Sequence, residues 1–465
     1  MNDLNAGRGR IGSSDRLAEP LRLADLTTVG VGGAMKRFVE PRTRQEFIDA
    51  VRDADDAGLP LLVIGGGSNL LVADEPFDGV VVRDARREVH RLGEGADAAD
   101  GANTQTAQEV LLRADAGVNW DDFVTSCVNG GFSGIEGLSG VPGTVGASVV
   151  QNIGAYGQEV AQCVHSVEAW DRQTSRMVTL THDDMHFGYR TSALKSSMYE
   201  AAGVPAKRFF PTPRYVVVSV TFVLCRSVNG VVAMGQLAKA LGVEVGCTMP
   251  LDAIREAVLQ VRAGKGMLED PLRYGTPAMR GVRRPQNVAE AMKQRAVQAS
   301  RSVALNQGAG TRINERTEAA HVARARADGG NANRAEMDQP DMNRHSCGSF
   351  FMNPVLSTTT AAALPADAPR FDVTLPDGTA GVKTSAAWLI DHAGFHKGFA
   401  VRPGAAAGLS TLHTLALTNR GGAKASDIAE LARTIADGVA AAFGVRLVPE
   451  PVVVGMDLMT PDRAQ

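Results

Sequence analysis

Two glycine-rich segments carry the residues whose types and spacing most clearly indicate chemistry. The longer runs from Leu138 to Glu159 and contains five glycines and one charged residue, at its end. Glycine lets the backbone come close to a ligand, and exposed amide N–H groups can hold a pyrophosphate without a cationic side chain. The shorter segment, residues 65–71, begins Gly-Gly-Gly-Ser-Asn and follows the apolar run 61–64, which is typical of a buried strand ending in a turn. Together they predict one large, phosphate-bearing cofactor.

The shorter segment fits neither of two familiar nucleotide motifs. It lacks the lysine of a P-loop and the G-x-G-x-x-G spacing of a dinucleotide fingerprint. Alone, it could equally be a tight turn after a buried strand. The presence of the second glycine segment makes a flavin site the better interpretation.

Three further residues could do acid, base or carboxylate chemistry. Arg190 lies in the segment 187–192, Ser349 in 348–354 and Glu450 in 448–451. Singly, a serine before two phenylalanines is usually a strand or turn residue, and a lone arginine or glutamate is usually solvated. They can act together only if the fold brings them into one site.

The elements that must position these residues follow from periodicity and from end signals. The region 41–82 reads as a small α+β unit. The helix expected over 426–443 has Ser426 as its N-cap and Gly444 just past its end. Helices are expected within 41–59, over Trp120–Asn129, after Gly230, over Leu251–Arg262 and around Ser385–His392. Strands are expected at 61–64, 79–82, 164–170, 176–179, 215–225, 412–418 and 446–454, and residues 140–157 are expected to form a loop.

The composition bounds the remaining possibilities. At 465 residues two or three domains are expected, and 44% hydrophobic residues with 21% charged residues are ordinary for a globular protein. A net charge of −3 gives no signature of nucleic-acid or membrane binding. The five scattered cysteines contain no Cys-x-x-Cys pair, which favours reduced thiols in a cytoplasmic protein. No secretion signal or membrane span is expected, and His345, His396 and His413 lack metal-ligand spacing, so no metal is expected.

In combination the motifs resemble those of the UDP-N-acetylenolpyruvoylglucosamine reductase family. The likeness covers most of the chain, from Leu26 to Gly455, and the pair Tyr189-Arg190 resembles the longer of the family's two types. The motifs, in order, are Gly-Gly-Gly-Ser-Asn, residues 151–157, Gly-Tyr-Arg, Gly-Ser-Phe-Phe and residues 415–421.

The resemblance implies an α+β fold: a two-subdomain FAD-binding module of the vanillyl-alcohol-oxidase/PCMH type followed by a C-terminal α+β substrate-binding domain. We expect the first FAD subdomain at 21–92, the second at 109–226, and the substrate domain at 227–455. Residues 1–20 are expected to be a flexible N-terminus, 93–108 a low-complexity loop and 456–465 a tail. Residues 271–340, with twelve lysines and arginines against six acidic residues, read as a disordered basic insertion. The alternative is a docking segment for an acidic partner or a neighbouring cell-wall enzyme, with the partner unknown.

The resemblance also implies the reaction. NADPH would reduce FAD, and the flavin would pass hydride to the enolpyruvyl group of UDP-N-acetylglucosamine enolpyruvate, giving UDP-N-acetylmuramate for peptidoglycan synthesis and hence for cell shape and division. Ser349 would donate the proton, because the hydride step leaves an enolate-like carbanion. Arg190 would hold the substrate carboxylate in paired hydrogen bonds. Glu450 would polarise the same enolate, with its protonated form as one option.

The remaining expected contacts come from matched motif positions. Tyr189, Asn353 and Lys265 are expected to bind substrate, and Lys265 is expected to contact either the nucleotide phosphates or the nicotinamide cofactor. Met234 stands where the family usually has a tyrosine over the substrate, and Cys347 stands where a small residue is common. The FAD contacts are expected at Ile64, Gly65, Gly66, Gly67, Ser68, Asn69, Leu70, Gly140, Val141, Pro142, Gly143, Gly146, Ala147, Gln151, Asn152, Gly154 and Ala155.

Two other functions stay open at this stage. One is a flavin oxidase or dehydrogenase of the same fold acting on another substrate, which has no evident use for a serine acid. The other is a non-catalytic flavin-binding relative, which would have been free to lose Arg190, Ser349 and Glu450.

Overall fold

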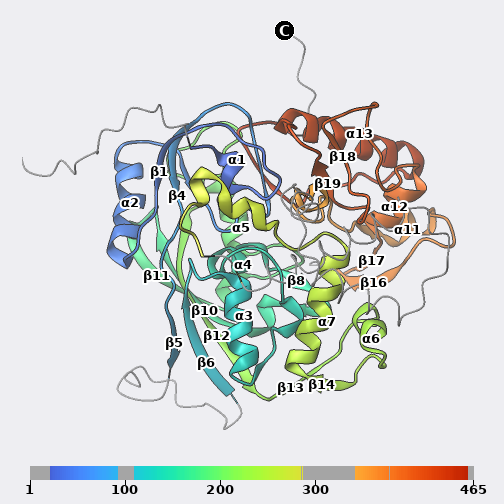
Figure 1. Cartoon of the computed structure of the whole chain (residues 1–465), viewed down its shortest axis with the longest axis horizontal. Helices are drawn as coiled ribbons and strands as arrows, with labels where there is room; N and C mark the ends of the chain where they lie inside the picture. Colours follow the sequence, from blue (N-terminus) through green and yellow to red (C-terminus); the bar gives the residue numbers. More distant parts are fainter. Residues whose placement is uncertain (1–20, 93–108, 284, 286–340, 376–377, 459–465) are drawn as a thin grey trace, which may run out of the picture.

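The computed structural model describes residues 21–92, 109–283, 285, 341–375 and 378–458. Figure 1 shows three groups of elements: α2 with β1 and β4, an antiparallel sheet beside α3 and α4, and a set of helices with short strands that includes α11, α12 and α13. None of the helices in this described part is both long and apolar enough to span a membrane.

The first group is a small parallel α/β unit. Its sheet has the order β1-β4-β2, with Leu61 of β2 beside Val80 of β4. Helix α2 begins at a capping box between Thr43 and Glu46, and its apolar face, including Phe47, is buried against the sheet. The elements are α1 Leu23–Leu26, β1 Met35–Val39, α2 Arg44–Asp56, β2 Leu61–Val63, β3 Leu70–Val72 and β4 Phe77–Val82.

The second group is an antiparallel sheet in the order β11-β10-β12-β6-β5, with β7 also paired to β12. Trp120, Phe123 and Phe222 pack in its core. Strand β5 pairs with β6, so it belongs to this sheet although it lies within residues 21–92, the range expected for the first subdomain. The elements are β5 Val89–Leu92, β6 Glu109–Asp115, α3 Trp120–Asn129, β7 Phe132–Ser133, η1 Glu136–Leu138, α4 Val145–Gln151, β8 Gly154–Ala155, β9 Gln158–Glu159, η2 Val160–Cys163, β10 Val164–Asp171, β11 Arg176–Thr181, η3 Asp183–Met185, α5 Ala193–Glu200 and β12 Tyr215–Arg226.

Part of the longer glycine segment is helical, so the expectation of a loop over 140–157 is wrong for α4. Val145 and Val149 are fully buried on one side of this helix. Gly146 lies flush against Ala116, where an added Cβ would come within 2.7 Å of the alanine Cβ. The helix ends at Asn152, which has a left-handed φ of 46°. The small residues thus allow the helix to pack directly against the backbone around Ala116.

The third group contains helices around short antiparallel ladders, β13-β14, β15-β17-β16 and β18-β19. Helix α13 packs one apolar face into its core and ends at Gly444, which has a φ of 66° as its position predicts. Its N-cap residue is Lys424, whose backbone N–H donates to Asp427 at 2.8 Å, so the assignment of Ser426 as the N-cap is wrong. The elements are β13 Asn229–Val231, α6 Gly235–Leu241, β14 Thr248–Pro250, α7 Leu251–Gly264, η4 Pro271–Gly275, η5 Pro277–Met279, η6 Met342–Arg344, β15 Val355–Ser357, α11 Thr358–Ala362, β16 Phe371–Thr374, β17 Ala380–Lys383, α12 Ala386–His392, β18 Ala407–Leu409, β19 Leu417–Asn419, α13 Ala425–Phe443 and β20 Val452–Val454.

The last strand returns to the first unit. Strand β20 pairs in parallel with β3, and Val452 lies beside Leu70. The N–H of Val452 also donates to the carbonyl of Asn69, 2.9 Å away. The backbone just after Glu450 is therefore joined to the end of the shorter glycine segment, across a gap of more than 380 residues in the sequence.

The described start of the expected insertion is ordered. Residues 271–283 contain η4 and η5, and Tyr274, Ala278 and Met279 are buried in the core of the first unit. The expectation of disorder is therefore wrong for these residues. The rest of the insertion, apart from residue 285, lies outside the described residues, as do the N-terminus 1–20 and the loop 93–108. Of the expected tail, Leu458 is buried against the core that contains α13.

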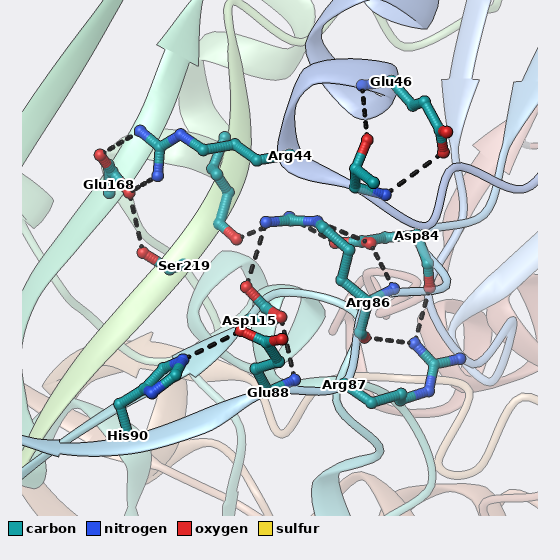
Figure 2. A network of polar contacts seen from close by, with 12 residues as sticks. Arg44, Glu46, Asp84, Arg86, Arg87, Glu88, His90, Asp115, Glu168 and Ser219 are labelled. Carbon is teal, nitrogen blue, oxygen red and sulfur yellow. Dashed lines mark hydrogen bonds and ion pairs between the residues drawn. The ribbon is translucent and has the colours of Figure 1, made fainter.

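A polar network joins the first two units (Figure 2). Arg44 of α2 forms a paired ion contact with Glu168 of β10, and this contact holds the pKa of Glu168 below its usual range. Arg86 bonds to Asp84 at 2.7 Å and to Asp115 of β6 at 3.1 Å, and its side chain is almost fully buried. Such a network is costly to break because each partner would leave a charge unpaired. It fixes the two units relative to each other.

Candidate active site

A cavity of about 520 Å³ lies where the three groups of elements meet, within the range of pockets that hold cofactors or substrates. Both glycine segments line it. The predicted cofactor residues on its wall are Ile64, Gly65, Gly66, Gly67, Ser68, Asn69, Leu70, Val141, Pro142, Gly143, Gly146, Ala147, Gln151, Gly154 and Ala155. Gly140 and Asn152 lie behind this wall: Gly140 bonds to Asp121 and Asn152 to the carbonyl of Gly188.

The two glycine segments touch through their backbones. A Cβ added to Gly66 would lie 2.5 Å from the Cα of Gly143, and one added to Gly67 would lie 1.9 Å from the carbonyl oxygen of Leu26. The hydroxyl of Ser68 donates to the carbonyl of Pro142 at 2.9 Å and ties the segments together. Only glycine fits these positions. The resulting wall of uncharged, closely approachable backbone suits the pyrophosphate and ring system of FAD.

Charged side chains hold the glycine segments from behind. Asp121 is fully buried, accepts from the N–H of Gly140 and forms two 2.7 Å bonds with Arg255. Arg262 donates to the carbonyl of Gly140 at 3.0 Å, and Arg273 donates to that of Gly66 at 2.6 Å. These supports did not emerge from the sequence, because each partner lies far away in the chain.

Arg190 and Glu450 meet at one end of the cavity. Arg190 precedes α5 and Glu450 precedes β20, and the Nε of Arg190 lies 3.1 Å from Oε1 of Glu450. The Arg190 guanidinium also donates to the carbonyls of Asn152 at 3.3 Å and Gly154 at 2.6 Å. Its backbone has a left-handed φ of 56°, an uncommon conformation for a residue other than glycine. The guanidinium is therefore held in one orientation.

Ser349 lines the same cavity next to His413. Its segment is fixed by backbone bonds of Phe350 to Leu415 at 2.8 Å and of Met352 to Val448 at 2.9 Å. The Ser349 hydroxyl lies 3.4 Å from Nε2 of His413. Burial, assisted by Lys265, Lys397 and Arg262, lowers the pKa of His413 to about 4. The imidazole beside the serine is thus neutral at pH 7.

The three predicted substrate residues lie at or beside the cavity. Lys265 lines it and donates to Gln236 at 3.0 Å, and burial lowers its pKa. Tyr189 lies beside Arg190, whose guanidinium is 5.4 Å from the ring centre, and it hydrogen-bonds to Asn353. Asn353 also accepts from the N–H of Ala386 at 3.0 Å. Tyr189 and Asn353 lie beside the cavity and do not line it.

The remaining singled-out residues have simpler settings. Met234 lies half-exposed at the cavity. The Cys347 thiol donates to the carbonyl of Leu70 at 3.1 Å, and burial raises its pKa to about 12, so it is not a reactive thiolate. His345 pairs with Asp270 at 3.2 Å, and His396 pairs with Asp391 on the surface. No cluster of three or more metal-ligating side chains occurs within the described ranges.

Lys195 was missed by the sequence reasoning. It lies five residues after Arg190, near the start of α5, and its ammonium reaches Gln151 on the cavity wall. The local signal was weak: a lysine five residues after the arginine of a Gly-Tyr-Arg motif. Its partner is known only from the fold.

This fold and site define a flavin-dependent oxidoreductase. Residues 35–181 match the family model described as an FAD binding domain, which confirms the expected fold class. Residues 339–454 match the model described as the C-terminal domain of UDP-N-acetylenolpyruvoylglucosamine reductase. That second match covers Ser349 and Glu450.

Full-length relatives carry the same name. The chain is 38% identical to the UDP-N-acetylenolpyruvoylglucosamine reductase of Thermobifida fusca, over 95% of this chain and 99% of the relative. It is 37% identical to that of Cutibacterium acnes, over 94% and 90% respectively. The solved MurB structure from Thermus caldophilus covers 94% of this chain and 98% of its own, with 22% identity and a TM-score of 0.48. The chain belongs to the UDP-N-acetylenolpyruvoylglucosamine reductase family, as the motifs predicted.

Proposed function

We propose that this protein uses NADPH and FAD to reduce the enolpyruvyl group of UDP-N-acetylglucosamine enolpyruvate in the cytoplasm. The product is UDP-N-acetylmuramate, a precursor of peptidoglycan and hence of cell shape and division. The observation that carries the proposal is the convergence of Arg190, Glu450 and Ser349 on the cavity walled by the two glycine segments.

FAD would be held by the backbone of Gly65–Asn69 and of residues 141–147, where the close approach of Gly66 to Gly143 excludes larger residues. When bound and reduced, FAD supplies the hydride for the terminal carbon of the enolpyruvyl group. The bond from Ser68 to Pro142 joins the two glycine segments.

Arg190 suits recognition of the substrate carboxylate. Two of its N–H groups donate to the carbonyls of Asn152 and Gly154, its Nε faces Glu450 in an ion pair, and a guanidinium carries five N–H groups. The two remaining donors can hold one carboxylate, and negative charge that develops on it during hydride addition strengthens those bonds. Because the other bonds already fix the guanidinium, little reorganisation is needed.

Glu450 is placed to hold Arg190 in position. Its Oε1 lies 3.1 Å from the Nε of Arg190 in an ion pair and accepts from the amide nitrogen of Gln151 at 3.1 Å. Both contacts are made by the same carboxyl oxygen. Its role is then to orient Arg190 at the enolate.

Ser349 is the proposed proton donor to the carbanion that hydride addition leaves. The neighbouring imidazole of His413 is neutral at pH 7, since its pKa is about 4, so it does not act as a cationic acid. It can hydrogen-bond the serine oxygen and hold the hydroxyl in place.

Anaerobic half-reactions test the proposal. NADPH should bleach the flavin absorbance at about 450 nm, and UDP-N-acetylglucosamine enolpyruvate should restore it with formation of a lactyl ether. Flavin that stays bleached after the substrate is added would refute the proposed substrate. A comparison with NADH at equal concentration tests the nicotinamide preference.

The Ser349→Ala variant tests the proton donor. It should keep flavin reduction by NADPH and slow flavin reoxidation by substrate about 100-fold or more, the usual contribution of a general acid. Ser126→Ala, on the exposed face of α3, is the matched control and should change neither step. Equal loss of both half-reactions in Ser349→Ala would argue against the role.

A further inference from the structure

We propose that Lys195 is a positioning residue for the reaction, acting through Gln151 on Glu450. This inference rests on the proposed function. It assigns a role to a half-buried lysine that has none in the reaction proposed for Ser349, Arg190 and Glu450.

The contacts form a short chain from α5 to the reacting end of the cavity. The Nζ of Lys195 donates to Oε1 of Gln151 at 2.8 Å, and Nε2 of Gln151 donates to Oε1 of Glu450 at 3.1 Å. Lys195 also donates to the backbone carbonyl of Arg190 at 3.3 Å. The same lysine therefore touches the segment that carries Arg190 and the amide that contacts Glu450.

The direction of these bonds matters. A glutamine amide can present either its oxygen or its nitrogen to a neighbour. An ammonium group only donates, so Lys195 fixes the oxygen of Gln151 toward itself. The amide nitrogen must then face Glu450. Without Lys195, the amide could turn its oxygen toward the carboxylate, which would repel Glu450 from its place beside Arg190.

The lysine also sets the charge of the site. Arg190 and Lys195 are the cations and Glu450 is the anion of this cluster, which leaves one positive charge for the substrate carboxylate. Burial lowers the pKa of Lys195, the nearby Glu450 opposes this effect, and Arg190 adds to it. The charge is thus kept in a poorly solvated place where it acts strongly on the enolate.

The direct test uses the FAD-loaded protein and measures each half-reaction. Lys195→Met should leave flavin reduction by NADPH within about twofold and slow reoxidation by substrate about 10- to 100-fold, the range for loss of a hydrogen bond to a charged group. Lys195→Arg should recover part of the lost rate because it still only donates. Lys36→Met, which removes an exposed lysine paired with Asp78, is the control and should match the wild type.

A double-mutant cycle tests the route through Gln151. Gln151→Leu alone should slow reoxidation by about as much as Lys195→Met, and the double variant should add no more than about twofold. If the double variant instead slows reoxidation by the product of the two single effects, the route through Gln151 is refuted. Because Gln151 lines the cavity, the flavin content and absorbance spectrum of each variant are compared first.

The wild-type pH profile gives a readout that a purely structural lysine would not give. Reoxidation should slow at alkaline pH, where Lys195 loses its proton earlier than an ordinary lysine, and Lys195→Met should lack this limb. An identical limb in both proteins would overturn the inference, as would unchanged reoxidation in Lys195→Met. Failure of the wild type to reoxidise with substrate would instead refute the proposed function itself.

Discussion

Replacing Gly66 by alanine should weaken FAD binding about 30- to 700-fold while leaving the protein folded. The added Cβ would lie 2.5 Å from the Cα of Gly143, where ordinary contact begins at 3.4 Å. Both atoms belong to or adjoin backbone, so neither can rotate away, and the two glycine segments must separate by about 1 Å. Loss of one or two amide bonds to a charged phosphate costs about 2–4 kcal/mol, which gives the stated range.

Titration of the apoprotein with FAD, followed by flavin fluorescence, measures this change directly. Thermal unfolding of the apoprotein shows whether the fold survives. Gly264→Ala is the matched control, because no heavy atom lies within 4 Å of its added Cβ, and it should bind FAD as the wild type does. A folded Gly66→Ala protein with unchanged FAD affinity would refute the idea that backbone contact between the two segments forms the phosphate site.

Two further predictions concern stability. Asp121→Ala should lower the free energy of unfolding by about 3–5 kcal/mol, because it leaves the buried Arg255 unpaired, and a loss below about 1 kcal/mol in urea titration would contradict this reasoning. His413 has a pKa of about 4 in the folded protein against 6.5 ordinarily, so the unfolded chain takes up the proton first and stability falls as the pH drops from 6.5 to 4. His413→Gln should remove that component, up to about 3 kcal/mol, in denaturant unfolding over this range, and an unchanged pH slope would count against it.

The sequence predicted best those elements whose apolar pattern and end residues lie within one short segment. The expected helix Trp120–Asn129 appears with those bounds, because its apolar face and the Asn119 cap that the structure shows both lie within one short stretch of chain. Residues 271–283 show the opposite case. This segment, with its prolines and arginines, shows no helix or strand periodicity. Tyr274 and Met279 become buried only because they pack against the core of the first unit. No pattern within the segment itself reveals that contact.

The residues of the site also fall into two groups: those in short motifs and those that support them from distant parts of the chain. Glycine motifs and the residues Arg190, Ser349 and Glu450 could be named from the sequence, since each stands in a recognisable short motif. Their supports could not. Gln151 and Glu450 are 299 positions apart, and Lys195 reaches Gln151 across 44 positions. Such contacts are set by the packing of whole units, so their bonding directions emerge only with the fold.

The pairing of β20 with β3 has a consequence for how the protein is made. Strand β3 follows the shorter glycine segment directly, and its only strand partner within the described chain is β20, at residues 452–454. During translation the ribosome delivers β3 early, but its partner β20 is made only after residues 73–451 have been synthesised. The pairing that joins β3 to the segment after Glu450 therefore forms late. A nascent chain must hold β3 without its strand partner until β20 arrives.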